Sequence, residues 1–104
     1  MKVERSWGYY QVLYTANSFH VKELVINPHS ALSMQRHEYR SETWNVVEGN
    51  AFVILNDNKI ELKKEESIFI PVNTWHKGVN ESDEECHIIA VSYTHLTLPT
   101  KRIV

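Results

Sequence analysis

The chain has 104 residues, which is enough for one domain with a single hydrophobic core, and it carries a formal net charge of −2. This slightly acidic balance excludes the broad basic surface that binds nucleic acids or anionic membranes. The single cysteine, Cys86, cannot form an internal disulfide, and no apolar run resembles a signal peptide or a membrane span. We therefore expect a cytoplasmic protein with neither a nucleic-acid nor a membrane partner.

Short runs of β-branched and aromatic residues, separated by polar turns, follow one another along the chain. They predict strands at residues 9–14, 19–26, 32–36, 43–48, 51–55, 59–62, 67–70, 77–80 and 86–91. No segment has the periodicity of an amphipathic helix. Tight hairpin turns are expected at residues 48–50, where Gly49 can adopt positive φ, and at residues 55–59. Many short antiparallel strands predict an all-β barrel or jelly roll, in which closure hides the strand edges.

Four side chains have a spacing that suits one mononuclear metal site. Gln35 and His37 are alternate residues of a predicted strand and should share one face, and Glu42 returns on the next strand. His76 comes from a distant segment, and closure of the fold can bring it to the same point. Two imidazoles, a carboxylate and an amide oxygen form a ligand set suited to Zn, Mn or Fe.

The surrounding segments resemble a known family. Glu42-x6-Gly49 and Pro71-x-Asn73-x2-His76-x3-Asn80 look like the two sequence motifs of the cupin superfamily. Within it, residues 5–10, 21–28, 32–44 and 70–71 resemble the type II phosphomannose isomerases, which occur alone or as the C-terminal domain of mannose-1-phosphate guanylyltransferases. The resemblance runs over about residues 5–89, and Gln35 is specific to it because cupins in general usually have histidine there.

The sequence departs from the family's pattern at four positions. Ser6 stands where the family usually has proline, and Thr43 stands where it has histidine beside the presumed site. His29 and Asn73 both replace glycines, although asparagine tolerates a left-handed turn better than most residues.

The resemblance implies a fold, a reaction and a cofactor. The fold is a single-domain cupin over residues 1–91, that is, a conical β-barrel or double-stranded β-helix jelly roll. The reaction is the interconversion of mannose 6-phosphate and fructose 6-phosphate. One divalent metal ion, most simply zinc with manganese, cobalt or iron as alternatives, would be held by Gln35, His37, Glu42 and His76.

Candidate residues for the chemistry are fewer and less specific. Lys22 shares a strand face with Leu24 and Ile26 and is a candidate for the catalytic site, with an exposed edge lysine as the alternative. Arg40 lies between two proposed ligands, and its forked guanidinium suits a phosphate or a developing enediolate; a solvated turn arginine is the alternative. Arg5 and Trp75 are candidates for substrate binding, although a loose terminus and simple packing would also explain them.

Three functions remain open from the sequence. A sugar-phosphate isomerase is the first, with a sugar phosphate as its partner. Another metal-cupin enzyme, such as an oxygenase, could use His37, Glu42 and His76 alone. A non-catalytic sugar-binding or dimerisation module is the third, and Thr43 keeps it open. We also expect a homodimer, since cupins commonly bury strand edges by pairing.

Residues 92–104 resemble nothing in the family. We expect an atypical, non-native tail of the kind that arises when foreign sequence is translated at the end of a gene fragment, with a divergent native tail as the alternative. His95 is therefore not expected to be a ligand.

Overall fold

The computed structural model describes residues 1–95, which form ten β-strands and their connections. The strands are β1 Lys2–Arg5, β2 Gly8–Thr15, β3 Phe19–Ile26, β4 Ser30–Ala31, β5 Arg40–Glu48, β6 Ala51–Leu55, β7 Asn58–Leu62, β8 Ser67–Ile70, β9 His76–Asn80 and β10 Cys86–Thr94. The expected all-β class is confirmed. Among the described residues, no helix is long and apolar enough to cross a membrane.

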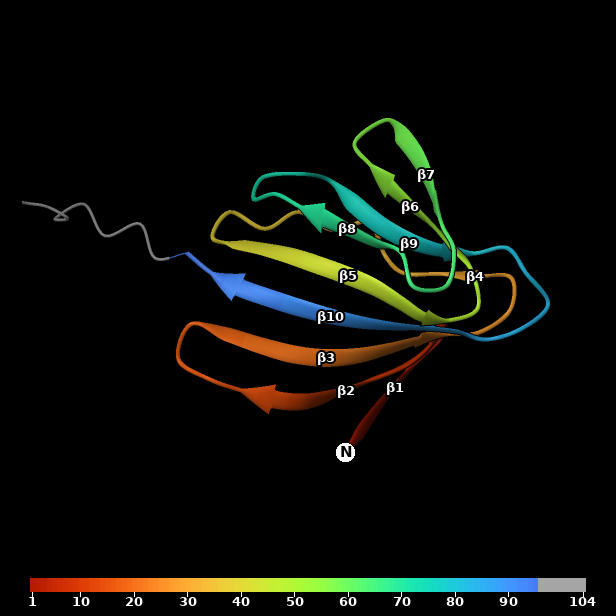
Figure 1. Ribbon diagram of the computed structural model, residues 1–104, viewed down its shortest axis with the longest axis horizontal. Coiled ribbons are helices and arrows are strands. Elements are labelled where there is room, and N and C mark those ends of the chain that lie inside the picture. Colours follow the sequence, from red (N-terminus) through yellow and green to blue (C-terminus); the bar gives the residue numbers. More distant parts are fainter. Residues whose placement is uncertain (96–104) are drawn as a thin grey trace, which may run out of the picture.

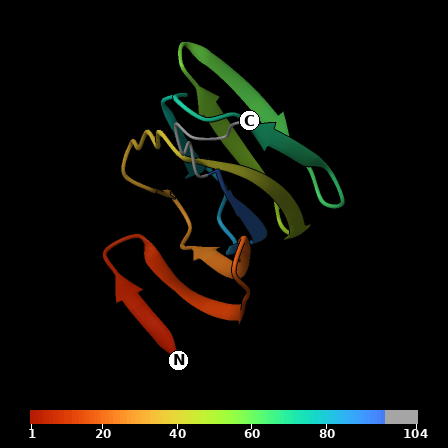
Figure 2. The same cartoon turned by 90° about the vertical axis from the view of Figure 1, so that its left-hand side faces the viewer.

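The strands form two antiparallel sheets. One has six strands in the order β1-β2-β3-β10-β5-β8, and the other has four in the order β4-β9-β6-β7. Figure 1 shows the long strands β2, β3, β10 and β5 side by side, with β6, β7 and β9 above them. In the turned view the red N-terminal strands and the green β6–β7 hairpin lie at opposite ends of the molecule (Figure 2).

Alternation along the strands turns one face of each sheet inward. On β5 the residues Glu42, Trp44 and Val46 are buried, whereas their neighbours Thr43 and Asn45 are more accessible. Strands β9 and β10 show the same alternation. The inward side chains form one hydrophobic cluster: Leu24, Ile26, Leu32, Trp44, Val46, Ala51, Val53, Leu62, Ile70, Cys86, Ile88 and Ala90.

One end of the inward faces carries a buried carboxylate and a buried imidazole, those of Glu42 and His76. On β5 the buried residues Val46, Trp44 and Glu42 follow one another toward this end, and strand β9 begins there with the buried His76. Burying a carboxylate and an imidazole is costly unless each has a partner, so this polar end must be internally paired. This buried polar cluster is therefore the candidate functional site.

The structure differs from the expected elements at several points. Residues 32–36 do not form a strand; this stretch is hydrogen-bonded to β9 through the backbone N–H of Leu32, which donates to the carbonyl oxygen of Gly78, and through an isolated bridge between Gln35 and His76. Strand β1 was not expected, because its four residues lack a distinctive pattern.

The turn at Gly49 is not a hairpin turn within one sheet. Gly49 has a φ of 81°, as expected, but β5 and β6 belong to different sheets, so the turn carries the chain from one sheet to the other. The turn at Asn56 and Asp57 does join a paired hairpin, β6 and β7. His29 and Asn73, both in place of family glycines, have φ values of 55° and 58°.

The last strand is longer than expected. Strand β10 continues to Thr94 and pairs with β3 and β5 along this length, and Ser92 is buried. His95 makes a hydrogen bond of 2.8 Å with Ser41. Most of the proposed non-native tail, residues 96–104, lies outside the described residues, so its origin remains a prediction.

Candidate metal centre and pocket

Two histidines and one glutamate converge at the polar end of the interior. Glu42 lies on β5, His76 begins β9, and His37 comes from the loop before β5; their ligand atoms all lie within 4.8 Å of one another. His37 Nε2 is 3.6 Å from Glu42 Oε2, and His76 Nε2 is 3.8 Å from the same oxygen. Three of the four predicted ligands therefore meet, although they are separated by up to 39 positions in the chain (76 − 37).

Neighbouring groups orient two members of this triad. His76 Nδ1 lies 2.8 Å from the carbonyl oxygen of Thr74, and because a carbonyl can only accept, the ring proton must be on Nδ1. The lone pair of His76 Nε2 is then free to bind a cation, as is usual for metal-binding histidines. The Trp44 indole donates a 2.7 Å hydrogen bond to Glu42 Oε1, which fixes the carboxylate and leaves Oε2 toward the histidines.

The positive charge of Arg40 balances the negative charge of Glu42 in this cluster. Its Nε donates to Glu42 Oε2 over 3.2 Å, and its Nη2 donates to His37 Nε2 over 2.6 Å. Burial, with a further contribution from the positive charge of Arg40, holds the pKa of His37 below its usual value. His37 is thus kept neutral and its Nε2 acts as an acceptor, which is the form that also binds metal.

The triad fits a divalent cation. Two ligands about 2.1 Å from a tetrahedral zinc ion lie about 3.4 Å apart, close to the observed separations of 3.6 and 3.8 Å. Gln35 is joined to His76 by two backbone hydrogen bonds of 2.8 and 2.9 Å, which place it next to the triad. Whether its amide oxygen is the fourth ligand remains a prediction.

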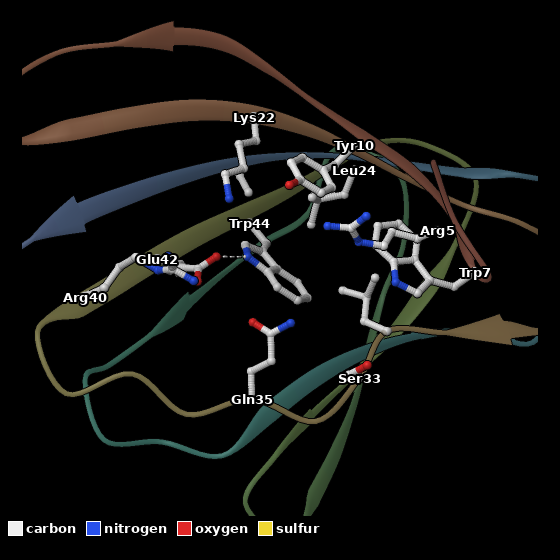
Figure 3. Close-up of a pocket in the computed structure, with 12 residues that line it drawn as sticks. Arg5, Trp7, Tyr10, Lys22, Leu24, Ser33, Gln35, Arg40, Glu42 and Trp44 are labelled. Carbon is white, nitrogen blue, oxygen red and sulfur yellow. Dashed lines mark hydrogen bonds and ion pairs between the residues drawn. The ribbon is translucent and has the colours of Figure 1, made fainter. Parts of the chain in front are cut away.

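A pocket of about 280 Å³ opens beside the triad. Its lining comes from β1, β2 and the turn between them, from β3, β5 and β10, and from the loop that carries Gln35. It comprises Arg5, Trp7, Tyr10, Lys22, Leu24, Leu32, Ser33, Gln35, Arg40, Glu42, Trp44 and Ala90. Figure 3 shows Glu42 and Arg40 at one end, Arg5 and Trp7 at the other, and Lys22 and Gln35 on opposite sides. Among the predicted residues, Arg5, Lys22, Gln35, Arg40 and Glu42 therefore line one cavity.

Three of the lining side chains carry positive charge. Lys22 Nζ and the Arg5 guanidinium lie 5.1 and 5.3 Å from the centre of the Tyr10 ring, so both are held against the same aromatic side chain. Partial burial, and then the charge of Arg40, lower the pKa of Lys22, while Glu42 opposes the shift. Glu42 thus joins the metal-type triad to a pocket whose other lining residues include three cationic side chains.

Trp75 is not among the residues that line this pocket. His76 points inward, so its neighbour in an extended chain points outward, and Trp75 is 51% exposed. Trp7 and Trp44 supply the indoles of the pocket instead, together with Tyr10. Trp44 also belongs to the hydrophobic core. The link between Trp7 and the pocket depends on the pairing of β1 and β2, which no local pattern reveals.

Fold and site together define a cupin, and solved structures agree. The cupin domain of Schizosaccharomyces pombe Cnp3 superposes with a TM-score of 0.79 at 14% identity, covering 83% of this chain and 64% of that one. A sugar phosphate isomerase of the cupin superfamily from Silicibacter pomeroyi superposes with a TM-score of 0.68 at 19% identity, covering 74% and 51%. At these identities the likeness concerns the fold, and it confirms the expected fold class.

The chain belongs to the family described as mannose-6-phosphate isomerase, C-terminal, whose model matches residues 1–97. The alginate biosynthesis protein AlgA of Pseudomonas putida is 34% identical over 91 residues, which cover 88% of this chain and 19% of that protein. A mannose-1-phosphate guanylyltransferase of Salmonella muenchen is 30% identical over 91 residues, with the same two coverages. The chain thus spans about a fifth of the length of these curated relatives, and the expected family is confirmed.

Proposed function

We propose that this chain is a metal-dependent isomerase that interconverts mannose 6-phosphate and fructose 6-phosphate in the cytoplasm. The observation that carries the proposal is a pocket that Glu42 of the His37–Glu42–His76 triad shares with three basic side chains. A divalent cation suits the adjacent oxygens of an open-chain sugar, and the basic side chains suit its phosphate. The family to which the chain belongs supports the same reaction.

The triad and Gln35 would hold one divalent ion, with zinc expected and manganese, cobalt or iron as alternatives. Such an ion supplies Lewis-acid polarisation of the sugar oxygens at C1 and C2. Glu42 contributes the negative charge of the ligand set, and Trp44 keeps its carboxylate oriented through the 2.7 Å hydrogen bond.

Aldose–ketose isomerisation moves a proton between C2 and C1 through an enediol and needs a general base. Lys22 fills this role in the proposal, because its lowered pKa raises the neutral fraction that can accept the C2 proton. The same ammonium then returns the proton to C1, so the residue is regenerated. Arg40 lies beside Glu42 and supplies positive charge where the enediolate develops.

Arg5 is the better candidate for the phosphate. It lies at the end of the pocket opposite Glu42, whereas Arg40 extends from β5 at the Glu42 end (Figure 3). A sugar with C1 and C2 at the triad would direct its C6 phosphate toward the far end, and the guanidinium fork matches phosphate oxygens. Trp7, which lies at the same end as Arg5, and Tyr10 provide aromatic surface for the sugar (Figure 3).

The test is a coupled assay of mannose 6-phosphate conversion with Zn²⁺, Mn²⁺, Co²⁺ or Fe²⁺, alongside metal analysis of each variant. Lys22→Met should lower kcat by about 100-fold or more while metal content stays at the wild-type level. Lys59→Met is the matched control, because Lys59 is a surface lysine paired with Glu81. Arg5→Met should mainly raise KM.

Loss of all isomerase activity with every metal in the wild type would sink the proposal. Sugar binding without turnover would then favour the non-catalytic module. Oxygen consumption with Fe²⁺ would favour an oxygenase, which uses the same set of two histidines and one carboxylate.

A further inference from the structure

Arg40 makes hydrogen bonds to two of the three ligand atoms of the triad. Its Nη2 is 2.6 Å from His37 Nε2, and its Nε is 3.2 Å from Glu42 Oε2. These two atoms lie 3.6 Å apart, and both residues belong to the set that would hold a divalent ion. The guanidinium therefore stands between a carboxylate and a neutral imidazole, as a metal cation would.

The arginine and a metal ion cannot both bind His37. A neutral imidazole has one acceptor nitrogen with one lone pair in the ring plane, and in His37 the guanidinium, which can only donate, uses it. Coordination of a cation needs the same lone pair. Glu42 is less restrictive, because a carboxylate oxygen can accept from more than one partner.

Electrostatic repulsion also opposes simultaneous binding of Arg40 and a divalent ion to the triad. Glu42 and Arg40 form an ion pair at 3.2 Å in a partly buried setting, with the Glu42 side chain only 7% exposed. A divalent ion bound to Glu42 Oε2 would place two positive charges within a few ångströms of the guanidinium. Their repulsion is poorly screened away from bulk water.

We propose that Arg40 is a built-in cation that competes with a divalent ion for His37 and Glu42 and is exchanged for that ion when metal binds. The proposal rests on the metal site of the proposed function and adds a regulation of it. Arg40 also lines the neighbouring pocket, and its side chain is 29% exposed, so the released guanidinium can move into this pocket. Metal binding then adds a free guanidinium to the pocket that already holds Lys22 and Arg5.

The exchange predicts that Arg40 lowers metal affinity, the opposite of what a supporting neighbour of a metal site does. The experiment titrates wild type, Arg40→Met and Lys22→Met with Zn²⁺ in competition with a chromophoric chelator. Arg40→Met should bind Zn²⁺ about tenfold more tightly or better, because a charge-assisted hydrogen bond no longer competes. Lys22→Met is the matched control, since Lys22 acts on Glu42 and His37 only through its charge.

Equal or weaker Zn²⁺ binding by Arg40→Met would overturn the proposal. So would an equal gain in Lys22→Met, which would mean that only the positive charge of the pocket matters. If neither wild type nor Arg40→Met binds Zn²⁺, the proposal also fails. The readout is affinity and not turnover, so an inactive protein that shows the exchange would refute the isomerase proposal alone.

A second measurement needs no variant. In the metal-free wild type the Nε–H group of Arg40 is hydrogen-bonded to Glu42, and its NMR signal should exchange slowly with water. Saturating Zn²⁺ should speed this exchange. Unchanged or slower exchange with Zn²⁺ bound would show that the guanidinium stays in place, and the proposal would fall.

Discussion

At the scale of single residues, burial of the charged Lys22 side chain in the pocket lowers the free energy of unfolding. Lys22 is half-buried, and desolvation together with the nearby Arg40 lowers its pKa from the ordinary value of 10.5. A group whose pKa is lower in the folded than in the unfolded state binds fewer protons on folding. Its charged form therefore destabilises the fold below the folded-state pKa, and this cost disappears as pH rises toward the unfolded-state pKa.

Lys22→Met should for this reason raise the melting temperature at neutral pH. The gain should be at most about 4 °C, because the partly exposed ammonium is still screened by water. It should shrink as pH approaches 10.5, because Lys22 of the folded wild type then loses its charge and the cost of burying that charge disappears. Thermal melts from pH 7 to pH 10 measure it, and Lys59→Met should show no such gain. A lower melting temperature for Lys22→Met would contradict this account.

Sequence reasoning reached some of these residues and missed others. The triad was predictable because its residue types and spacing are informative without coordinates. Tyr10 was missed as a pocket residue, since an aromatic side chain in a strand is equally compatible with core packing. The contact of Arg40 with His37 was also missed, because spacing places the two residues near each other but does not say what their side chains bind.

At the scale of elements, Asn80 ties three segments together. Its fully buried side chain donates to the carbonyl oxygens of Ile26, Asn27 and Glu84, and accepts from the backbone N–H and the hydroxyl of Ser82. The end of β9, the end of β3 and the loop before β10 thus share one amide. A buried network of this kind is costly to leave half-satisfied.

Asn80→Ala should destabilise the domain by about 2 kcal/mol or more, because several buried carbonyl groups lose their donor. Chemical denaturation at neutral pH measures the change. Asn45→Ala is the control: its amide donates to Ser67 at an exposed position, and its removal should cost less than about 0.5 kcal/mol. Comparable losses in the two variants would refute the role given to Asn80.

Most strands could be predicted from the alternation of apolar and polar residues, but the connections between the strands could not. The segment at residues 32–36 looked like a strand, yet only Leu32 is buried there, and the chain instead forms the loop that carries Gln35 and His37. The change of sheet at Gly49 also has no local signature. Addition of a Cβ at Gly49 would bring it within 2.6 Å of the carbonyl oxygen of Glu85, a contact set by the distant β10.

At the scale of the whole molecule, the two sheets leave edge strands unpaired by other strands of the described residues. Strands β1 and β8 bound the larger sheet, and exposed apolar side chains occur on β2 and β8, among them Leu13, Tyr14 and Phe69. The expected homodimer remains a proposal on this basis. Light scattering at tens of micromolar concentration would settle it, and a strictly monomeric mass would count against it.

Both proposals depend on one claim about the whole chain, namely that His37, Glu42 and His76 form a single divalent site. A ligand that binds only the folded state must stabilise it. Each ligand comes from a different part of the chain, so a bound ion would join β5, β9 and the loop before β5. Removal of one ligand should abolish most of this stabilisation without removing the fold.

The most direct measurement is a set of thermal melts of wild type, His37→Ala and His87→Ala with and without Zn²⁺ or Mn²⁺. His87 is the matched control, because it is a partly buried histidine that pairs with Glu23 outside the triad. At a metal concentration about 100 times Kd, wild type and His87→Ala should gain about 10 °C or more, and His37→Ala should gain little. An equal gain in His37→Ala would contradict the metal site and, with it, both proposals.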